Sequence, residues 1–182
     1  MRQKIPNPFL WQLFNLFFIT LFQSGLFVLF TYPVYSLTFY SAESLPVLFW
    51  VFAVLGIVLV CFEFAADQQQ WNFQTAKKAA AAQKDYHAKY SGDVKNGFLS
   101  QGFFAFSRHP NYFCELGFWW TIWLAAFSLT WNPLSSGLFG PVLLTIIIAS
   151  STYLAESISS SKYPEYQNYK KKVTSIIPWF SK

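Results

Sequence analysis

Four apolar runs, each about 20 residues long, limit this chain to a small set of folds. They lie at approximately 9–30, 45–64, 112–129 and 137–155. A helix of that length spans the hydrocarbon core of a bilayer. The composition agrees, because 54% of the 182 residues are hydrophobic, 22% are aromatic and only 12% are charged, whereas about a quarter are charged in a soluble domain. The sequence therefore predicts one all-α membrane domain, residues 1–182, with about four transmembrane helices in a lipid bilayer.

The basic residues predict the orientation of these helices. Lysine and arginine are absent from the short connections 31–44 and 130–136, and they gather in the N-terminus, the loop 65–111 and the tail 156–182. Positive residues accumulate on the cytoplasmic side of membrane proteins. We therefore expect both termini and the long loop to be cytoplasmic. The membrane is that of the endoplasmic reticulum or a bacterial inner membrane, since the rule serves both.

Several classes of site are excluded. The net charge of +5 is explained by helix orientation and anionic lipids, so we expect no nucleic-acid partner. Cys61 and Cys114 lie in or beside spans without paired spacing, which favours buried, unreactive thiols. His87 and His109 belong to no ligand-spaced cluster, so we expect no metal site. No GxGxxG or P-loop occurs, which excludes the soluble dinucleotide-binding fold.

The second apolar run is predicted to continue as one long helix beyond the membrane. No proline or glycine interrupts 57–90 after Gly56, so the helix leaves the membrane near Asp67 and extends into the cytoplasm. Polar residues at i, i+4, i+7 and i+11 form one stripe at this exit: Glu63, Asp67, Gln70 and Gln74. The stripe is either a solvated helix end or a cofactor-binding wall that faces Arg108 and His109.

The strongest candidate for chemistry is the nine-residue cluster 107–115, Ser-Arg-His-Pro-Asn-Tyr-Phe-Cys-Glu, which leads into the third apolar run. Pro110 suits the first turn of a helix, which leaves Arg108 and His109 just outside it. Helix N-terminal amides beside an arginine make a plausible phosphate or carboxylate site. The structural alternative is an interfacial cap in which Arg108 neutralises Glu115. Ionisable groups at membrane depth usually line a polar cavity, which favours a functional site over a purely structural cap.

Shorter features of the sequence predict the remaining local structure. Tyr32-Pro33 is expected to end the first helix, and Ser91-Gly92-Asp93 and Asn96-Gly97 are expected to be turns. The first span carries a polar stripe that suits helix–helix hydrogen bonds or ligand contact: Gln12, Asn15 and Gln23. Glu156 lies at the boundary after the fourth run. The apolar tail 176–180 is predicted to be an interfacial anchor, with a lid over the cavity as the alternative.

The chain resembles the DUF1295 branch of the steroid 5-alpha-reductase superfamily. The resemblance rests on Gly102–Glu115, on the helix-exit motif Glu63–Gln68 and on the ending from Tyr163-Pro164-Glu165-Tyr166 to Ile177-Pro178-Trp179. Arg2 and Asn7-Pro8 are also similar to the middle of such a protein. Three ordered motifs at fitting separations cover essentially the whole chain.

The resemblance implies a membrane enzyme that holds NADPH in a cytosol-facing cavity and transfers hydride to a carbon–carbon double bond of a lipid or steroid-like enone. The cofactor-pocket positions that it implies are Glu63, Asp67, Asn111 and Glu115. Arg108, His109 and Tyr112 belong to the motif. The sequence departs from the family at Cys114, where glycine is usual. The resemblance also implies additional N-terminal helices that this sequence does not contain, so we expect a shortened member of the family, a fragment, or a protein that completes its cavity as a homo-oligomer.

Two other interpretations stay open. Isoprenylcysteine and phospholipid methyltransferases are similar in their C-terminal halves, with an Arg-His-Pro-x-Tyr element and a later glutamate like Glu156, and they would use S-adenosylmethionine. Asn111 and the exit motif favour the reductase-like branch. The second alternative is a non-catalytic membrane scaffold that keeps the motif for packing.

Overall fold

The chain is a bundle of long helices. The computed structural model describes residues 6–39 and 45–179, so that Arg2 and Phe180, the last residue of the tail 176–180, lie outside the described part. Four helices are long and apolar enough to cross a membrane, and the described residues form no strand apart from an isolated parallel bridge between Ser107 and Thr174. The predicted all-α membrane fold is confirmed.

The first span is continuous from Pro8 to Thr38. It consists of α1 (Pro8–Phe14), a π-helical stretch (Asn15–Phe22) and α2 (Gln23–Thr38). The other spans are α3 (Val47–Ala81), α5 (Pro110–Thr130) and α6 (Phe139–Lys162). Shorter helices lie between or after them: Ala88–Tyr90, α4 (Ser91–Asn96), Gly102–Ala105 and α7 (Tyr166–Lys172).

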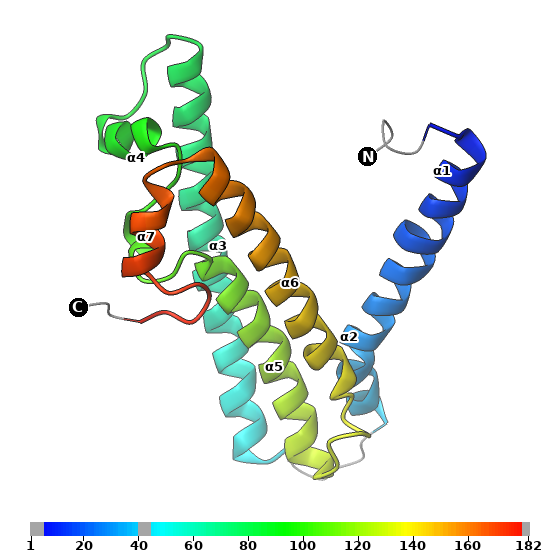
Figure 1. Ribbon diagram of the computed structural model, residues 1–182. Helices are drawn as coiled ribbons and strands as arrows, with labels where there is room; N and C mark the ends of the chain where they lie inside the picture. Colours follow the sequence, from blue (N-terminus) through cyan, green and yellow to red (C-terminus); the bar gives the residue numbers. More distant parts are fainter. Residues whose placement is uncertain (1–5, 40–44, 180–182) are drawn as a thin grey trace.

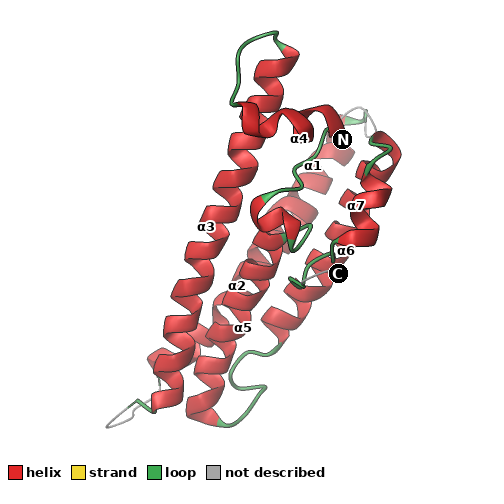
Figure 2. Cartoon of the chain, turned by 90° about the vertical axis from the view of Figure 1, so that its left-hand side faces the viewer, coloured by secondary structure: helices red, strands yellow, loops and turns green. Residues whose placement is uncertain are grey.

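The spans pack around one helix pair. α3 and α5 lie side by side over the length of α5, and α2 and α6 pack against α5 and against each other (Figures 1 and 2). α1 diverges from the bundle in Figure 1, and none of its side chains is buried. The start of α1, the α3–α5 connection with α4, and α7 lie toward the same end of the molecule. That arrangement agrees with an even number of spans, and the cytoplasmic location of this end stays a prediction.

Pro33 does not end the first helix, so that prediction is wrong. The residue is fully buried within α2, which continues to Thr38. A proline leaves the carbonyl four residues earlier without its helical partner, here that of Leu29. Gly140 of α6 lies so close that a Cβ atom on it would be 2.5 Å from the Leu29 carbonyl oxygen. A neighbouring helix that covers the freed carbonyl allows the proline to stay inside a membrane helix.

The long second helix is confirmed, although it is shorter than predicted. α3 runs for 35 residues, through the membrane exit, and ends at Ala81, followed by Gln83 in the left-handed region at φ 53°. The turn predicted at Ser91-Gly92-Asp93 is wrong, because these residues begin α4. The helix forms because Asp93 is buried and accepts hydrogen bonds from the side chains of Ser100 and Gln101, at 2.6 and 2.7 Å. The predicted turn at Gly97 is confirmed, with φ 89°.

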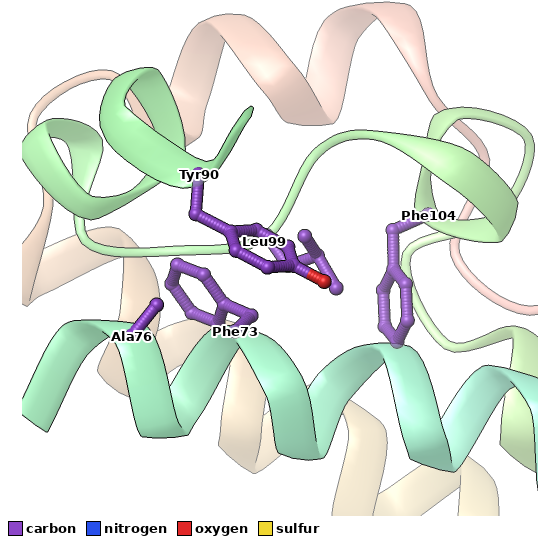
Figure 3. Packing of buried hydrophobic residues seen from close by; sticks show 5 residues of the cluster. All are labelled: Phe73, Ala76, Tyr90, Leu99 and Phe104. Carbon is purple, nitrogen blue, oxygen red and sulfur yellow. The ribbon is translucent and has the colours of Figure 1, made fainter. Parts of the chain in front are cut away.

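A small apolar core fixes the α3–α5 connection on the extension of α3. Figure 3 shows its side chains, which come from both segments and are almost fully buried: Phe73, Ala76, Tyr90, Leu99 and Phe104. The core holds the connection over one face of α3. It therefore positions the residues that precede α5.

The cysteines are only partly as predicted. Cys114 is buried between α5 and its neighbours, whereas Cys61 is exposed on the apolar surface of α3, so its predicted burial is wrong. Cys61 faces the lipid side of a helix that is apolar on nearly all sides at this level. A long apolar helix at the edge of a bundle presents half of its residues to lipid, and periodicity does not mark which half.

Candidate functional site

The motif segment 102–115 lies against the end of the chain. The backbone amides of Arg108 and His109 donate to the carbonyls of Thr174 and Ser175, at 2.9 and 3.0 Å. The Ser107 hydroxyl donates to the Ile176 carbonyl at 2.7 Å. The segment 173–179 thus folds back onto the motif. Ile177 and Trp179 nevertheless keep two-thirds of their surface exposed, as suits an interfacial segment.

Arg108 ties three segments together. Its Nε donates to Glu156 Oε1 at 2.8 Å and its Nη2 to Glu156 Oε2 at 2.9 Å. Its Nη1 donates to the carbonyls of Lys170 and Val173. Lys170 and Ser175 also contact Glu156, at 3.3 and 2.7 Å. The structural alternative, an interfacial cap in which Arg108 neutralises Glu115, is therefore wrong, because α6 places Glu156 against the guanidinium.

His109 precedes the first turn of α5, as predicted, with Pro110 at the first helical position. Its ring stacks on Tyr112, with centroids 5.2 Å apart and planes 8° from parallel. Its Nε2 is buried and lies 3.4 Å from Glu156 Oε1, outside hydrogen-bond geometry. Burial lowers the pKa of His109, Glu156 opposes that shift, and Arg108 reinforces it. The ring is therefore neutral near pH 7.

The other predicted carboxylates lie between α3 and α5. Asn111 donates to Asp67 at 3.0 Å and fixes the two helices at the membrane exit. One turn deeper, the carboxyl groups of Glu63 and Glu115 lie within hydrogen-bonding reach of each other. Trp119 Nε1 donates to Glu115 at 2.8 Å. Glu63 and Glu115 therefore place two carboxyl groups together between α3 and α5.

A cavity of about 630 Å³ lies between the extension of α3, the α3–α5 connection, the start of α5 and the α6–α7 region. Four predicted site residues line it: Arg108, His109, Asn111 and Tyr112. Glu156 and Asp67 do not line the cavity, but each accepts hydrogen bonds from a residue that does, Arg108 and Asn111 respectively. Glu63 and Glu115 lie outside the lining, deeper between the helices.

The cavity lining is basic and aromatic. Among residues 6–39 and 45–179, no aspartate or glutamate lines it. Its charged side chains other than Arg108 are Lys77, Lys78 and Lys162, and its phenols beyond Tyr112 are Tyr163, Tyr166 and Tyr169. Burial raises the pKa of Tyr166 and Tyr169, so these phenols stay neutral. An enclosed surface of this kind attracts anions.

Two residues that line the cavity carry a buried polar atom without a hydrogen-bond partner in the described part of the chain: Gln70 Oε1 and His109 Nε2. His109 Nε2 lies 3.4 Å from Glu156, so that carboxylate occupies its surroundings. Buried polar atoms in native proteins almost always have partners. Gln70 Oε1 is therefore the better candidate to bind a polar group of a ligand.

The sequence missed the lysines and tyrosines of the lining. Lys77 and Lys78 continue the stripe of Gln70 and Gln74 at i+7 and i+8, so helical periodicity could have revealed them. Lys162 and Tyr163 come from the end of α6, and no local pattern connects them with α3. Only the return of the chain through α7 shows that they share a cavity with the motif.

Comparison with known proteins agrees with the motifs. Residues 1–173 match the profile of a family described as "Protein of unknown function (DUF1295)". The chain belongs to the DUF1295 family. An uncharacterized protein of Schizosaccharomyces pombe is 29% identical over 181 residues. That alignment covers 97% of this chain and 52% of the yeast protein, so the chain spans about half the length of this relative. No solved structure matches the chain.

Proposed function

We propose that this DUF1295 protein binds NADPH in the basic cavity and reduces a carbon–carbon double bond of a lipid or steroid-like enone. The observation that carries the proposal is the charge of the lining: it holds three lysines and, among the described residues, no carboxylate. Arg108 also lines the cavity, but Glu156 balances its charge. NADPH is long and polyanionic. The resemblance to the steroid 5-alpha-reductase superfamily supports the same cofactor.

The lining favours NADPH over S-adenosylmethionine. S-adenosylmethionine carries a cationic sulfur and an ammonium group, which would meet like charges from Lys77, Lys78 and Lys162. Like charges in a cavity repel a ligand and suppress its binding. Phosphate groups would instead form charge-assisted hydrogen bonds with the same lysines.

The membrane end of the cavity fits the reactive end of the cofactor. Gln70 Oε1 can accept a hydrogen bond from an amide such as the nicotinamide carboxamide, and Asn111 can both donate and accept. The stacked rings of His109 and Tyr112 offer a flat wall nearby. When bound there, NADPH supplies a hydride.

An apolar groove supports a lipid-like substrate. It has a volume of about 390 Å³, lies between α3 and α5 on the bilayer side, and includes Gly56, Cys61 and Phe118. Along α5, Glu115 follows Asn111 by one turn and precedes Phe118 by about one turn. Along the helices, the Glu63–Glu115 pair therefore lies between the levels of the cavity and the groove, where a carboxyl group can supply a proton to the carbon next to the one that receives the hydride.

Calorimetric titration of the detergent-purified protein tests the proposal. NADPH and S-adenosylmethionine are titrated separately into the wild type, Asn111→Ala and Asn168→Ala. Asn168 is the matched control, because it is exposed, bonds to Glu165 at 3.0 Å and lies outside the cavity.

We expect saturable NADPH binding that Asn111→Ala weakens and Asn168→Ala does not. Binding of S-adenosylmethionine in place of NADPH would assign the protein to the methyltransferases. Binding of neither ligand would support the scaffold interpretation.

A further inference from the structure

Tyr163 is held between two lysines at the outer end of the cavity. Lys77 Nζ donates to the Tyr163 hydroxyl at 2.8 Å and lies 4.7 Å from the ring centroid. Lys162 Nζ lies 5.4 Å from the same centroid. These two ammonium groups, chiefly the hydrogen bond from Lys77, lower the pKa of the phenol. The two ammonium groups concentrate positive charge around the Tyr163 ring.

The arrangement is built by the fold rather than by chance contact of flexible side chains. Lys77 also donates to the Gly97 carbonyl at 2.5 Å. Gly97 adopts φ 89°, and a Cβ atom there would lie 2.3 Å from the Tyr163 ring. Lys77, the α4 turn and Tyr163 are therefore locked against one another.

The positive charge at this end is not neutralised by protein groups. The ion pairs in the described part of the chain all involve Glu156, and none includes Lys77, Lys78 or Lys162. Asp93 bonds to Ser100 and Gln101, and Glu165 bonds to Asn168. The three lysines thus face the cavity without a carboxylate partner.

The cavity has two chemically different ends. Lys77 and Lys78 follow Gln70 by seven and eight residues on α3, which places them about 10–12 Å farther along the helix. Gln70, His109 and Asn111 line the end nearer the membrane. A cofactor that reacts with a lipid substrate must place its reactive ring at the membrane end, so its other end reaches the lysines.

We propose that Lys78 and Lys162, which line the cavity beside Lys77 and Tyr163, bind the 2′-phosphate of NADPH and set its preference over NADH. This proposal rests on the proposed function. A dianionic phosphate ester forms strong charge-assisted hydrogen bonds with lysine ammonium groups. NADH has a neutral hydroxyl at the same position, and its hydrogen bonds with two ammonium groups are much weaker than those of a phosphate.

Two pairs of ligands that differ by one phosphate test the site. NADPH is compared with NADH, and 2′,5′-ADP with 5′-AMP, by calorimetric titration of the full chain in detergent. The variants are Lys78→Gln, Lys162→Gln and the double variant. Lys84→Gln is the matched control, since Lys84 is an exposed lysine just beyond α3 that does not line the cavity.

We expect the wild type to prefer NADPH and 2′,5′-ADP. Each cavity substitution should reduce that preference roughly tenfold, whereas Lys84→Gln should leave it unchanged. Equal affinity for the two members of each pair would overturn the phosphate site while leaving a dinucleotide pocket intact. Preference for 2′,5′-ADP without NADPH binding would keep the phosphate site and reject the proposed function. Binding of none of the four ligands would reject both.

Discussion

Arg108 and Glu156 form a bidentate ion pair between the start of α5 and the last turns of α6, with both hydrogen bonds between 2.8 and 2.9 Å. The two side chains are 8% and 9% exposed. A buried ion pair of this geometry fixes the relative position of the two segments that carry it. If one partner is removed, the other charge is left buried without a counterion. The pair therefore links the motif segment to the fourth span and to residues 170–175.

Glu156→Gln should strongly destabilise the protein, because it leaves the Arg108 guanidinium buried without a counterion. We expect a loss of about 3–5 kcal/mol, measured as a lower melting temperature of the purified protein in detergent. Lys170→Gln is the control, since Lys170 contacts the same carboxylate at 3.3 Å but is more exposed. Equal melting temperatures for the two variants would show that the ion pair does not support the fold.

His109 should make stability depend on pH. Its pKa in the folded protein lies below the ordinary value of 6.5, chiefly because the ring is buried. As the pH falls, the unfolded chain therefore takes up a proton on His109 before the folded protein does. The contribution of the neutral ring to the free energy of unfolding is present above pH 6.5 and is lost as the pH falls toward the folded pKa. The melting temperature of the wild type should fall over this interval, and His109→Gln should reduce the fall. An unchanged pH profile in the variant would contradict this origin.

Gly140→Ala should disrupt the crossing of α2 and α6. The added Cβ would lie 2.5 Å from the Leu29 carbonyl oxygen, a backbone atom that cannot move alone. We expect a destabilisation of about 1–3 kcal/mol in the same melting assay.

Gly25→Ala provides the matched control for Gly140→Ala. It lies in the same helix as Leu29, and nothing lies within 4 Å of its added Cβ. A helical glycine in open space gains stability from alanine, by up to about 1 kcal/mol. The prediction fails if both alanine variants melt at or above the wild-type temperature.

The Glu63–Glu115 pair should matter for turnover rather than for cofactor binding. The double variant Glu63→Gln/Glu115→Gln removes both carboxyl groups and keeps side chains of the same size. We expect it to lose enone reduction, followed as oxidation of NADPH, by a factor of about 10² or more, with the NADPH affinity within about threefold of the wild type. Full activity in this variant would show that another group supplies the proton for the reduction.

The sequence determined much of this protein through local rules. Run length and composition predicted the four spans, because any helix that crosses a bilayer needs about 20 apolar residues. The absence of proline and glycine predicted the extension of α3, and Pro110 predicted the start of α5. The motif also placed Arg108, His109, Asn111 and Tyr112 together, since they are neighbours in the chain.

Only the tertiary structure decided which partner each charged group has. Arg108 lies only seven residues from Glu115 in the sequence, yet it pairs with Glu156, 48 residues away, because α6 packs beside the motif segment. The same packing keeps Pro33 inside α2 by covering the Leu29 carbonyl. It also brings Lys162 and Tyr163 to Lys77. Helical periodicity sets the face on which a side chain lies, whereas its partner depends on which helices pack together, and that is a non-local property of the whole chain.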